Sequence, residues 1–432
     1  MSEPILPDPP ATAARLRPHL GVGGPVDLRA HRATFPRPPR ARRAADLALI
    51  ESVEAAGLRG RGGASFPTAV KLRAVAGGRA RPVVVANGSE GEPASYKDAE
   101  ILALGPHLVL DGAALAARAV GAEEVIVAVD ARQRGARASL ERALEERSGS
   151  EPPGVWVRVV DVPAGYVSGE ERSLVHLLNR GRAIPTTGPR PFVRGVRGRP
   201  TLIQNVETLA HLATIHAFGP GWFRSVGPPD MPGSMMVTIS GGVARPGVYE
   251  VEVGSPMRGA IAAAGGPSAG IGGVLVGGYA GSWLTPHVAD RVTLDPRALG
   301  AVGGILGAGI LVVLPERACG WSETAAVMGW LAGQTAGQCG PCVHGLAAIA
   351  GAAERIAAGR ARNEELDRLT RWATDVEGRG ACGLPDGAVR FMRSAIQVFG
   401  DDVRDHVRGH RCTAAREPRI LPTPGARRER AA

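Results

Sequence analysis

Helical and strand-like patterns of apolar residues alternate along the first half of the chain. Leu47, Ile50 and Val53 recur at helical spacing, and Gly57 after them is a typical helix stop. Strands are predicted at 82–86, 125–129 and 155–162, and helices at 45–56, from 68 onward, at 107–122 and around 140–146. This alternation predicts an α/β fold with a largely parallel sheet, in which ligands bind at the carboxyl ends of the strands.

The pattern changes after residue 230. A β-hairpin, a helix and two more strands are predicted at 237–250, 257–264, 273–276 and 310–314. From 322 to 398 the pattern is helical, with breaks at 333–341 and 378–385. We therefore divide the chain into an Arg/Pro-rich tail, an α/β domain, a small α+β domain, a helical bundle and a basic tail, at 1–45, 46–230, 231–315, 316–412 and 413–432.

The composition is typical of a chain with several folded domains, and the excess positive charge lies at the two ends of the sequence. The chain has 432 residues, of which 44% are hydrophobic and 21% charged, so it can bury several cores. Much of the net charge of +10 lies in segments 1–45 and 413–432, which are also rich in Pro and Ala. We expect these segments to be solvated, disordered tails, and we expect no nucleic-acid partner.

The chain shows no signal for a membrane or for export. Its longest nearly uncharged stretch, 299–314, is shorter than the ~18 residues of a spanning helix and is interrupted by glycines. The first ten residues lack the basic start and apolar run of an export signal. A cytoplasmic, reducing location is expected, where five cysteines indicate metal or redox chemistry rather than disulfides.

Lysine is rare in this chain. Only Lys71 and Lys97 occur among 51 basic residues, and both lie in or just after glycine-bearing loops. A compact ammonium group can meet a phosphate or flavin oxygen where a planar guanidinium does not fit. The alternative is chance placement on a solvated face.

The first of these loops favours an anionic ligand. Glycines at 60, 62 and 63 allow backbone N–H groups to converge on a phosphate. Arg61 and Lys71 add positive charge, and the helix that starts near Thr68 presents its N-terminal donors. These residues predict a site for a phosphorylated cofactor, with an ordinary tight turn as the alternative.

Acidic and aromatic residues accompany the glycine loops. The acids are Glu90, Glu92, Glu170 and Glu171. Carboxylates beside a phosphate site suit a nucleotide, whose ribose hydroxyls and amide group are donors, although such acids also favour helix starts. Phe66 and Phe192 each lie in a loop near proline, where a ring can stack on a nicotinamide or adenine or can instead fill a core.

The helical region carries a candidate metal site. Cys339 and Cys342 form a C-x2-C pair, and Cys382 follows forty residues later in a glycine-rich turn. Thiolates at this spacing could hold an iron–sulfur cluster or zinc. Cys319 is expected to be a small buried apolar residue, and Cys412 lies too close to the tail to interpret.

Four segments together resemble the NADH-oxidising flavoprotein subunit of respiratory complex I. They are 57–68 with Lys71, 87–98, 165–171 and 200–209, within a resemblance that spans about residues 46 to 412. The family includes the diaphorase subunits of NAD-linked hydrogenases and formate dehydrogenases. The resemblance implies a Rossmann-like FMN domain, a ubiquitin-like β-grasp domain of the soluble-ligand-binding type, and a C-terminal helical bundle that carries a [4Fe–4S] cluster.

The resemblance also implies which residues bind the cofactors. The positions that match FMN contacts are Gly60, Arg61, Gly62, Gly63, Lys71, Asn87, Glu90, Gly169, Glu170, Glu171, Gln204, Asn205 and Thr208. The positions that match the NADH site are Phe66, Glu92, Glu171 and Phe192, of which Glu92 and Glu171 are the candidate catalytic residues. The matching metal ligands are Cys339, Cys342 and Cys382.

The implied activity is that of an FMN-dependent NADH dehydrogenase. It would take hydride from NADH and pass electrons to a ferredoxin-like or other redox subunit, or to a membrane quinone-linked complex. The implied location is cytoplasmic, with attachment to the inner face of the membrane through partners as a further option. The alternative is a redox-silent or cluster-less relative that acts as a nucleotide-binding scaffold.

The chain departs from the family pattern at several positions. Ala336 stands where the family has the first cysteine of its Cys-Gly-x-Cys-x-Pro-Cys motif. The fourth ligand could be a side chain such as His344 or come from a partner, the site could hold a three-iron cluster, or no cluster could form. Ser89 replaces an Asp, Ser65 and Ala69 replace glycines, and Gln204 replaces an Asn.

Overall fold

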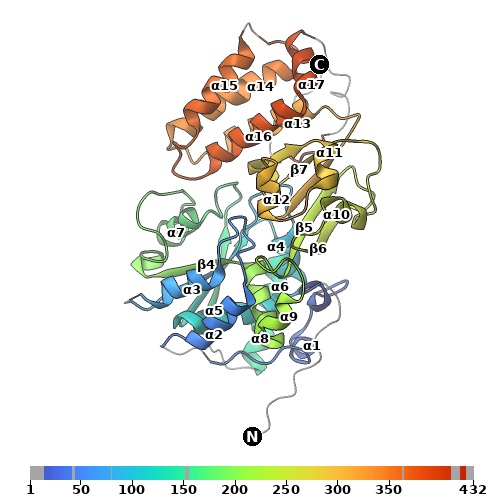
Figure 1. Cartoon of the computed structure of the whole chain (residues 1–432). Coiled ribbons are helices and arrows are strands. Elements are labelled where there is room, and N and C mark those ends of the chain that lie inside the picture. The colour runs from blue at the N-terminus through green and yellow to red at the C-terminus, as the bar shows by residue number, and fades with distance from the viewer. Residues whose placement is uncertain are drawn as a thin grey trace.

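The computed structural model describes residues 14–40, 44–78, 80–150, 155–361, 364–409 and 419–424. The α/β part lies at one end of an elongated molecule, the second sheet lies in the middle, and the helical bundle lies at the other end (Figure 1). Cys412 falls outside the described residues.

A four-stranded parallel sheet forms the centre of the first part, as the alternating pattern predicts. The order is β3-β2-β1-β4. The strands are β1 Val83–Gly88, β2 Glu124–Asp130, β3 Trp156–Val162 and β4 Thr201–Asn205. β1 pairs with both β2 and β4, so Asn87 lies beside Ala128 on one side and Asn205 on the other. The apolar pattern did not predict β4, because its five residues include Gln204 and Asn205.

Helices cover this sheet. They are α2 Leu47–Ala56, α3 Thr68–Ala76, α4 Lys97–Leu104, α5 Pro106–Val120, α6 Arg134–Ser150, α7 Glu171–Arg180, α8 Val206–Phe218 and α9 Pro220–Arg224. In α2, Ile50 and Val53 are buried as expected, but Leu47 is exposed and Leu49 takes its place. Helices α5 and α8 touch so closely at Gly112 that a Cβ there would lie 1.8 Å from the Leu209 carbonyl oxygen.

The second part is a five-stranded mixed sheet of order β6-β5-β9-β7-β8. Its strands are β5 Ser234–Gly241, β6 Gly247–Glu252, β7 Ile271–Val276, β8 Ser282–Leu284 and β9 Ile310–Pro315, with α10 Met257–Ala263, η3 Gly278–Ala280, α11 Pro286–Arg291 and α12 Pro296–Ala301 between them. The predicted hairpin is confirmed, because β5 and β6 pair antiparallel from Ser234 to Ile239. The apolar pattern did not predict three short elements, β8, α11 and α12.

The third part is helical, as predicted. It contains α13 Gly320–Gly333, the π-helical segment η4 Pro341–Leu346, α14 Ala347–Ala357, α15 Glu365–Val376, α16 Leu384–Val398 and α17 Gly400–Val407. The second sheet is anchored to it by Trp283, whose backbone N–H donates to Ser394 and whose indole N–H donates to Thr324 at 3.0 Å. The bundle and the second sheet therefore share one apolar core.

The expectation of a solvated N-terminal tail is wrong for residues 14–40. Segments η1 Arg17–His19 and α1 Leu28–Arg32 pack on the α/β part and bury Leu16, Leu20 and Phe35. Arg32 donates through two nitrogens to the buried carboxylate of Asp111 in α5. The Arg/Pro-rich composition concealed a few apolar anchors and a buried ion pair.

Part of the predicted C-terminal tail is also packed. Leu421 is buried, and its N–H together with that of Ile420 donates to the carboxylate of Glu323 in α13. The hydroxyl of Tyr279 donates to the Pro422 carbonyl at 2.6 Å. The expectation of a disordered tail is therefore wrong for residues 419–424.

Across the described residues, no single helix is long and apolar enough to cross a bilayer. The pair α4 and α5 meets that test by length and composition only, and it is bent by 98°. Nearly every residue of α5 is buried against its neighbours.

The packed N-terminal segment predicts a pH dependence of stability. Burial, with a smaller effect from His31, lowers the pKa of His19 to about 4 from the ordinary 6.5. Between these values the unfolded chain binds a proton that the folded chain does not, so stability falls as pH falls through this window. We expect His19→Phe, which keeps the ring packing against Phe35 and Phe218, to reduce the loss of Tm between about pH 7 and pH 5.

The matched control is His287→Phe, at an exposed position in α11. It should leave the slope of Tm against pH unchanged. Parallel curves for wild type and His19→Phe, measured by differential scanning calorimetry, would contradict the prediction.

Candidate functional site

The glycine loop at 57–67 is held in a closed shape before α3. The N–H of Gly60 donates to the Phe66 carbonyl at 2.8 Å, and the N–H of Thr68 donates to the Leu58 carbonyl at 2.9 Å. The Arg59 guanidinium crosses the loop and donates to the Ser65 carbonyl at 2.8 Å. The loop therefore has one preorganised conformation at the N-terminus of α3.

Within this loop, a short run of backbone is available to a ligand. Arg61 donates its N–H to the Thr208 hydroxyl at 2.9 Å, whereas the N–H groups of residues 62–64 have no acceptor among the described residues. Gly63 has a φ of 109°, and Gly62 lies so close to β4 that a Cβ would be 3.1 Å from Cβ of Asn205. Free N–H groups in a glycine turn form a cradle for an anion. The residues present fit the phosphate of FMN.

Ser65, at a family glycine position, adopts a backbone conformation that glycine adopts more easily. Its φ is 48°, in the left-handed region, which costs a residue with a Cβ about 1 kcal/mol. Ala69, the second replaced glycine, is buried in α3. The loop thus keeps the shape that glycine would adopt at position 65.

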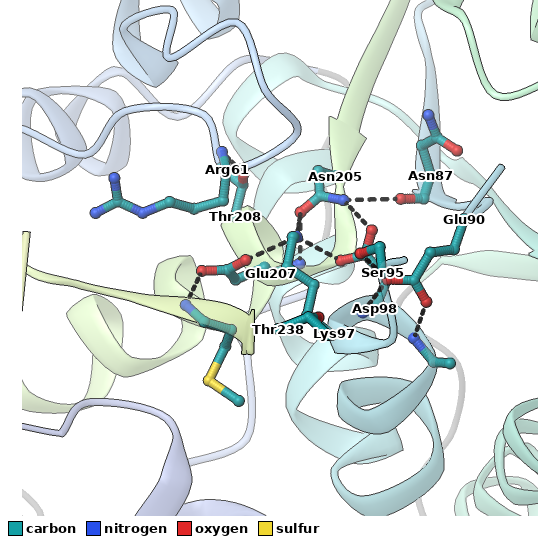
Figure 2. A network of polar contacts seen from close by, with 12 residues as sticks. Arg61, Asn87, Glu90, Ser95, Lys97, Asp98, Asn205, Glu207, Thr208 and Thr238 are labelled. Carbon is teal, nitrogen blue, oxygen red and sulfur yellow. Dashed lines mark hydrogen bonds and ion pairs between the residues drawn. The ribbon is translucent and has the colours of Figure 1, made fainter. Parts of the chain in front are cut away.

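The two cations of the first motif point in different directions. The Arg61 side chain is buried and reaches the Pro232 carbonyl at 3.4 Å, on the side of the second sheet (Figure 2). Lys71 forms an ion pair with Glu171 across the site, and both side chains are partly exposed. Lys71 is therefore the cation that the structure leaves accessible beside the loop.

Polar side chains tie the carboxyl ends of β1 and β4 to the loop before α7. The Asn87 amide donates to the Gly169 carbonyl at 2.9 Å. The Asn205 amide donates to Asp98 at 2.7 Å, and its oxygen accepts from the N–H of Glu207, which caps α8. Gln204 is buried, and its Nε2 has no acceptor among the described residues.

The same end of β1 carries Ser89, at a family Asp position. The Ser89 oxygen lies so close to Gly169 that a Cβ there would be 2.8 Å away. A side chain at position 169 would therefore require the Ser89 hydroxyl to move.

Glu90 acts locally as a helix cap. Its carboxylate accepts from the Ser95 hydroxyl at 2.5 Å and from the N–H groups of Asp98 and Ala99 in the first turn of α4. Burial and the nearby charge of Asp98 raise the pKa of Glu90 to about 7. These contacts account for both of its oxygens.

Glu92 lies at the junction of the α/β part and the second sheet. One oxygen accepts from the N–H of Tyr279 in η3 at 2.9 Å. The other, Oε1, is shielded from solvent, and the Tyr166 side chain lies close enough to this carboxylate to lower its pKa. Burial raises the pKa of Glu92 to about 7, although the Tyr279 N–H opposes that shift.

Glu170 and Glu171 begin α7. Glu170 caps the helix through the N–H groups of Arg172 and Ser173, and burial raises its pKa. Both acids line an open cleft of about 310 Å³ together with Cys382 of the bundle. The start of α7 and the loop that carries Cys382, far apart in sequence, thus face one cleft.

The two candidate stacking rings differ in the structure. Phe66 is 52% exposed at the tip of the glycine loop. Phe192 is partly buried and packs on the apolar core of the α/β part. Phe66 has the free ring that stacking requires, whereas Phe192 is partly a core residue, the alternative that its sequence left open.

Lys97 is the centre of a buried charge cluster that the sequence did not predict (Figure 2). It is 1% exposed and forms ion pairs with Asp98 at 2.8 Å and Glu207 at 2.7 Å. Burial disfavours its charge, but the two carboxylates outweigh that effect and raise its pKa. Lys97 therefore neither contacts a phosphate nor lies on a solvated face, the two possibilities that its sequence left open. Its ammonium is already neutralised inside the protein.

The cluster also joins the two sheets. Glu207 accepts from the N–H of Met236 in β5 at 2.8 Å, and the Thr238 hydroxyl in the same strand accepts from the N–H of Tyr96. This charge cluster therefore holds the second sheet against the carboxyl ends of β1 and β4.

The three predicted cysteine ligands come together around one small cavity. Cys339, Cys342 and Cys382 line it, as does Ala336. Cys342 is buried, and the other two are partly buried. Burial, with the nearby charges of Cys382 and Cys339, raises the pKa of Cys342 to about 11. Cys319 is buried elsewhere, with its sulfur 3.3 Å from the His406 ring.

Among the described residues, three thiols line this cavity, one fewer than the four cysteines that commonly hold a [4Fe–4S] cluster. In the same part of the chain, no group of three or more His, Cys, Asp or Glu side chains is placed to hold a metal ion. His344, which the sequence offers as an alternative ligand in this segment, is exposed and is not among the residues lining the cavity.

Three family models match parts of the chain. They are the Nuo51 FMN-binding domain at residues 53–214, the SLBB domain at 236–272, and the NADH-ubiquinone oxidoreductase-F iron-sulfur binding region at 322–406.

Relatives match over most of the chain. An F subunit of NADH-quinone oxidoreductase from Rhizobium meliloti is 32% identical over 378 residues, covering 84% of this chain and 90% of the relative. The F subunit of the same enzyme from Mycobacterium tuberculosis strain H37Rv is 34% identical over 384 residues, covering 84% and 85%. A structure of NAD+-reducing [NiFe]-hydrogenase in the H2-reduced state matches with a TM-score of 0.78 and 31% identity. That match covers 84% of this chain and 63% of the hydrogenase chain.

Because Lys97 is the cation of this cluster, we predict that removing it lowers the free energy of unfolding by a large amount. Lys97→Met leaves Asp98 and Glu207 buried without a positive partner, which costs roughly 3–5 kcal/mol. Lys71→Met removes a partly exposed pair and should cost no more than about 1 kcal/mol. Urea unfolding of the cofactor-free chain, followed by circular dichroism, compares the two variants. Equal shifts of the midpoint would contradict the structural role of Lys97.

Proposed function

The chain belongs to the family of NADH-quinone oxidoreductase F subunits, and we propose that it oxidises NADH at a bound FMN and passes the electrons to a redox partner. The observation that carries the proposal is a closed glycine loop with free backbone N–H groups at residues 62–64, packed against Asn205 at the carboxyl end of β4. This is the edge at which parallel α/β sheets bind ligands.

The chain's own residues would hold FMN by its phosphate and its polar edge. The free N–H groups of residues 62–64 and the ammonium of Lys71 supply positive potential for the phosphate. The buried Gln204 Nε2 supplies a donor that has no acceptor among the described residues. A bound FMN would supply two-electron chemistry toward NADH and one-electron chemistry toward the acceptor.

The nicotinamide dinucleotide would be positioned by the exposed residues around the same loop. The ring of Phe66 is free to stack on a planar base, because half of its surface is open to solvent. Glu171, exposed on one side and paired with Lys71, can accept from a ribose hydroxyl. The protein's contribution is orientation and electrostatics rather than acid–base chemistry.

Relatives of this chain are named as subunits of oxidoreductases, so we also propose that it works within a larger assembly. Its immediate partner would be another redox subunit, ferredoxin-like or quinone-linked. A cytoplasmic position, peripheral on the inner face of the membrane through such partners, is the location that we propose.

Flavin binding and reduction on one sample test the proposal. The purified full chain is titrated with FMN, and we expect quenching of flavin fluorescence at a one-to-one ratio. Anaerobic NADH should then bleach the flavin absorbance, and an artificial acceptor should restore it. A chain that binds no FMN would overturn the proposal and support the redox-silent scaffold.

A substitution of the exposed ring tests the NADH pose. Phe66→Ala should raise KM for NADH about tenfold, since aromatic stacking contributes about 0.5–1.5 kcal/mol beyond buried area. FMN affinity and Tm should not change, because the ring is 52% exposed and outside the core.

The matched control is Trp156→Ala. Trp156 is 58% exposed at the start of β3, the opposite edge of the sheet from the site. Steady-state kinetics with NADH should show no change in that variant. An unchanged KM in Phe66→Ala would contradict the stacking role.

A further inference from the structure

The C-terminal segment 419–424 is bound to the surface of α13 and η3 by one buried side chain and by its backbone. Leu421 is fully buried, in the apolar core that the bundle shares with the second sheet. Pro422 and Pro424, which follow it, are exposed. Leu421 is therefore the anchor, and the rest of the segment is held through its main-chain groups.

A carboxylate of α13 binds the first half of this segment. Glu323 is buried, and its two oxygens accept separately from the N–H of Ile420 at 3.3 Å and from the N–H of Leu421 at 2.9 Å. A buried carboxylate needs such donors, because burial without them is costly. Glu323 therefore forms a site for two consecutive N–H groups.

Two aromatic side chains bind the second half. The Tyr279 hydroxyl donates to the Pro422 carbonyl at 2.6 Å, and the Trp330 indole N–H donates to the Pro424 carbonyl at 3.1 Å. The two rings pack edge to face, with centroids 5.6 Å apart. Aromatic residues commonly line the sites that bind proline-containing peptides, and the polar tip of Tyr or Trp supplies a donor.

The sequence of the segment suits this surface. In Leu421-Pro422-Thr423-Pro424 neither proline has an N–H, and the surface binds both proline residues through their carbonyl groups. Because proline fixes φ, fewer backbone torsions are ordered when the segment binds. The residues that bind the segment lie 94 to 143 positions earlier in the chain, so its recognition does not depend on local connection.

We propose that Tyr279, Glu323 and Trp330 form a recognition site for a Leu-Pro-x-Pro segment, which residues 419–424 of the same chain occupy as a releasable latch. The latch joins the second sheet to the bundle, because Tyr279 belongs to η3 and the other two residues belong to α13. Tyr279 also donates its backbone N–H to Glu92, so the latch contacts a residue that holds part of the candidate nucleotide site.

Binding of a free peptide tests the proposal. Leu421→Asp in the full chain places a charge at the buried anchor and should release the segment. A fluorescein-labelled peptide of residues 419–425 should then bind this variant saturably, at a one-to-one ratio, in fluorescence anisotropy. Wild type should bind the peptide about tenfold more weakly, because its own segment competes intramolecularly. A peptide that carries the same Leu421→Asp substitution should bind neither protein.

Removing one donor tests how the segment is recognised. In the Leu421→Asp background, Tyr279→Phe removes the hydroxyl that binds the Pro422 carbonyl and keeps the ring and the backbone N–H. We expect about fivefold weaker peptide binding. The matched control is Tyr249→Phe in β6, which removes a hydroxyl that donates to the Arg245 carbonyl at 2.6 Å and should leave the affinity unchanged.

Limited trypsin digestion measures release in the intact chain. The N–H of the Arg419–Ile420 peptide bond donates to Glu323, so cleavage at this bond should be slow in wild type. It should be several-fold faster in Leu421→Asp and in Glu323→Gln, which keeps the shape of the acceptor but removes the charge that strengthens both hydrogen bonds. If circular dichroism shows that Leu421→Asp does not fold, Glu323→Gln replaces it as the release variant in the peptide titration.

Three outcomes would overturn the inference. They are a folded release variant that binds no peptide, equal peptide binding by wild type and the release variant, and equal rates of cleavage after Arg419 in all variants. None of these measurements uses FMN or NADH, so this inference and the proposed activity can fail independently.

Discussion

The buried ion cluster around Lys97 is the interaction on which the arrangement of this molecule depends. A lysine that is 1% exposed stays charged because Asp98 and Glu207 lie within 2.8 Å, and each carboxylate is tied to a different element. Asp98 also bonds Asn205 at the end of β4, and Glu207 reaches Met236 in β5. Removing the lysine would leave both buried carboxylates without their cation. The cluster thus fixes the ligand edge of the first sheet and the position of the second sheet together.

The candidate site is built at junctions rather than within one part. Glu92 of the α/β part accepts a hydrogen bond from Tyr279 of the second sheet, and Tyr166 donates its backbone N–H to Gln334 of the bundle at 3.0 Å. The cleft beside α7 is lined by Glu170 on one side and Cys382 on the other. Residues of the α/β part and a cysteine of the bundle therefore face the same cleft.

Local features of the site were predictable from the sequence because they depend on neighbouring residues. A glycine run can form an N–H cradle only through its own backbone, and Gly63 indeed has a positive φ. The cysteine spacing likewise indicated which thiols share a cavity. The roles of Arg61 and Lys97 were not predictable, since a cation's partners lie on distant elements: Arg61 turns toward Pro232, and Lys97 meets Glu207.

The sequence by itself determined the alternation of strands and helices, the hairpin, the bundle and the resemblance to a family, because periodicity and short motifs are local properties. It did not reveal that residues 14–40 and 419–424 pack on the core, since a few apolar anchors are hidden in a tail-like composition. Only the tertiary structure decided which charges are buried and paired, which ring stays exposed, and that three thiolates surround a cavity with an alanine in it. These outcomes depend on contacts between segments far apart along the chain, which no local pattern encodes.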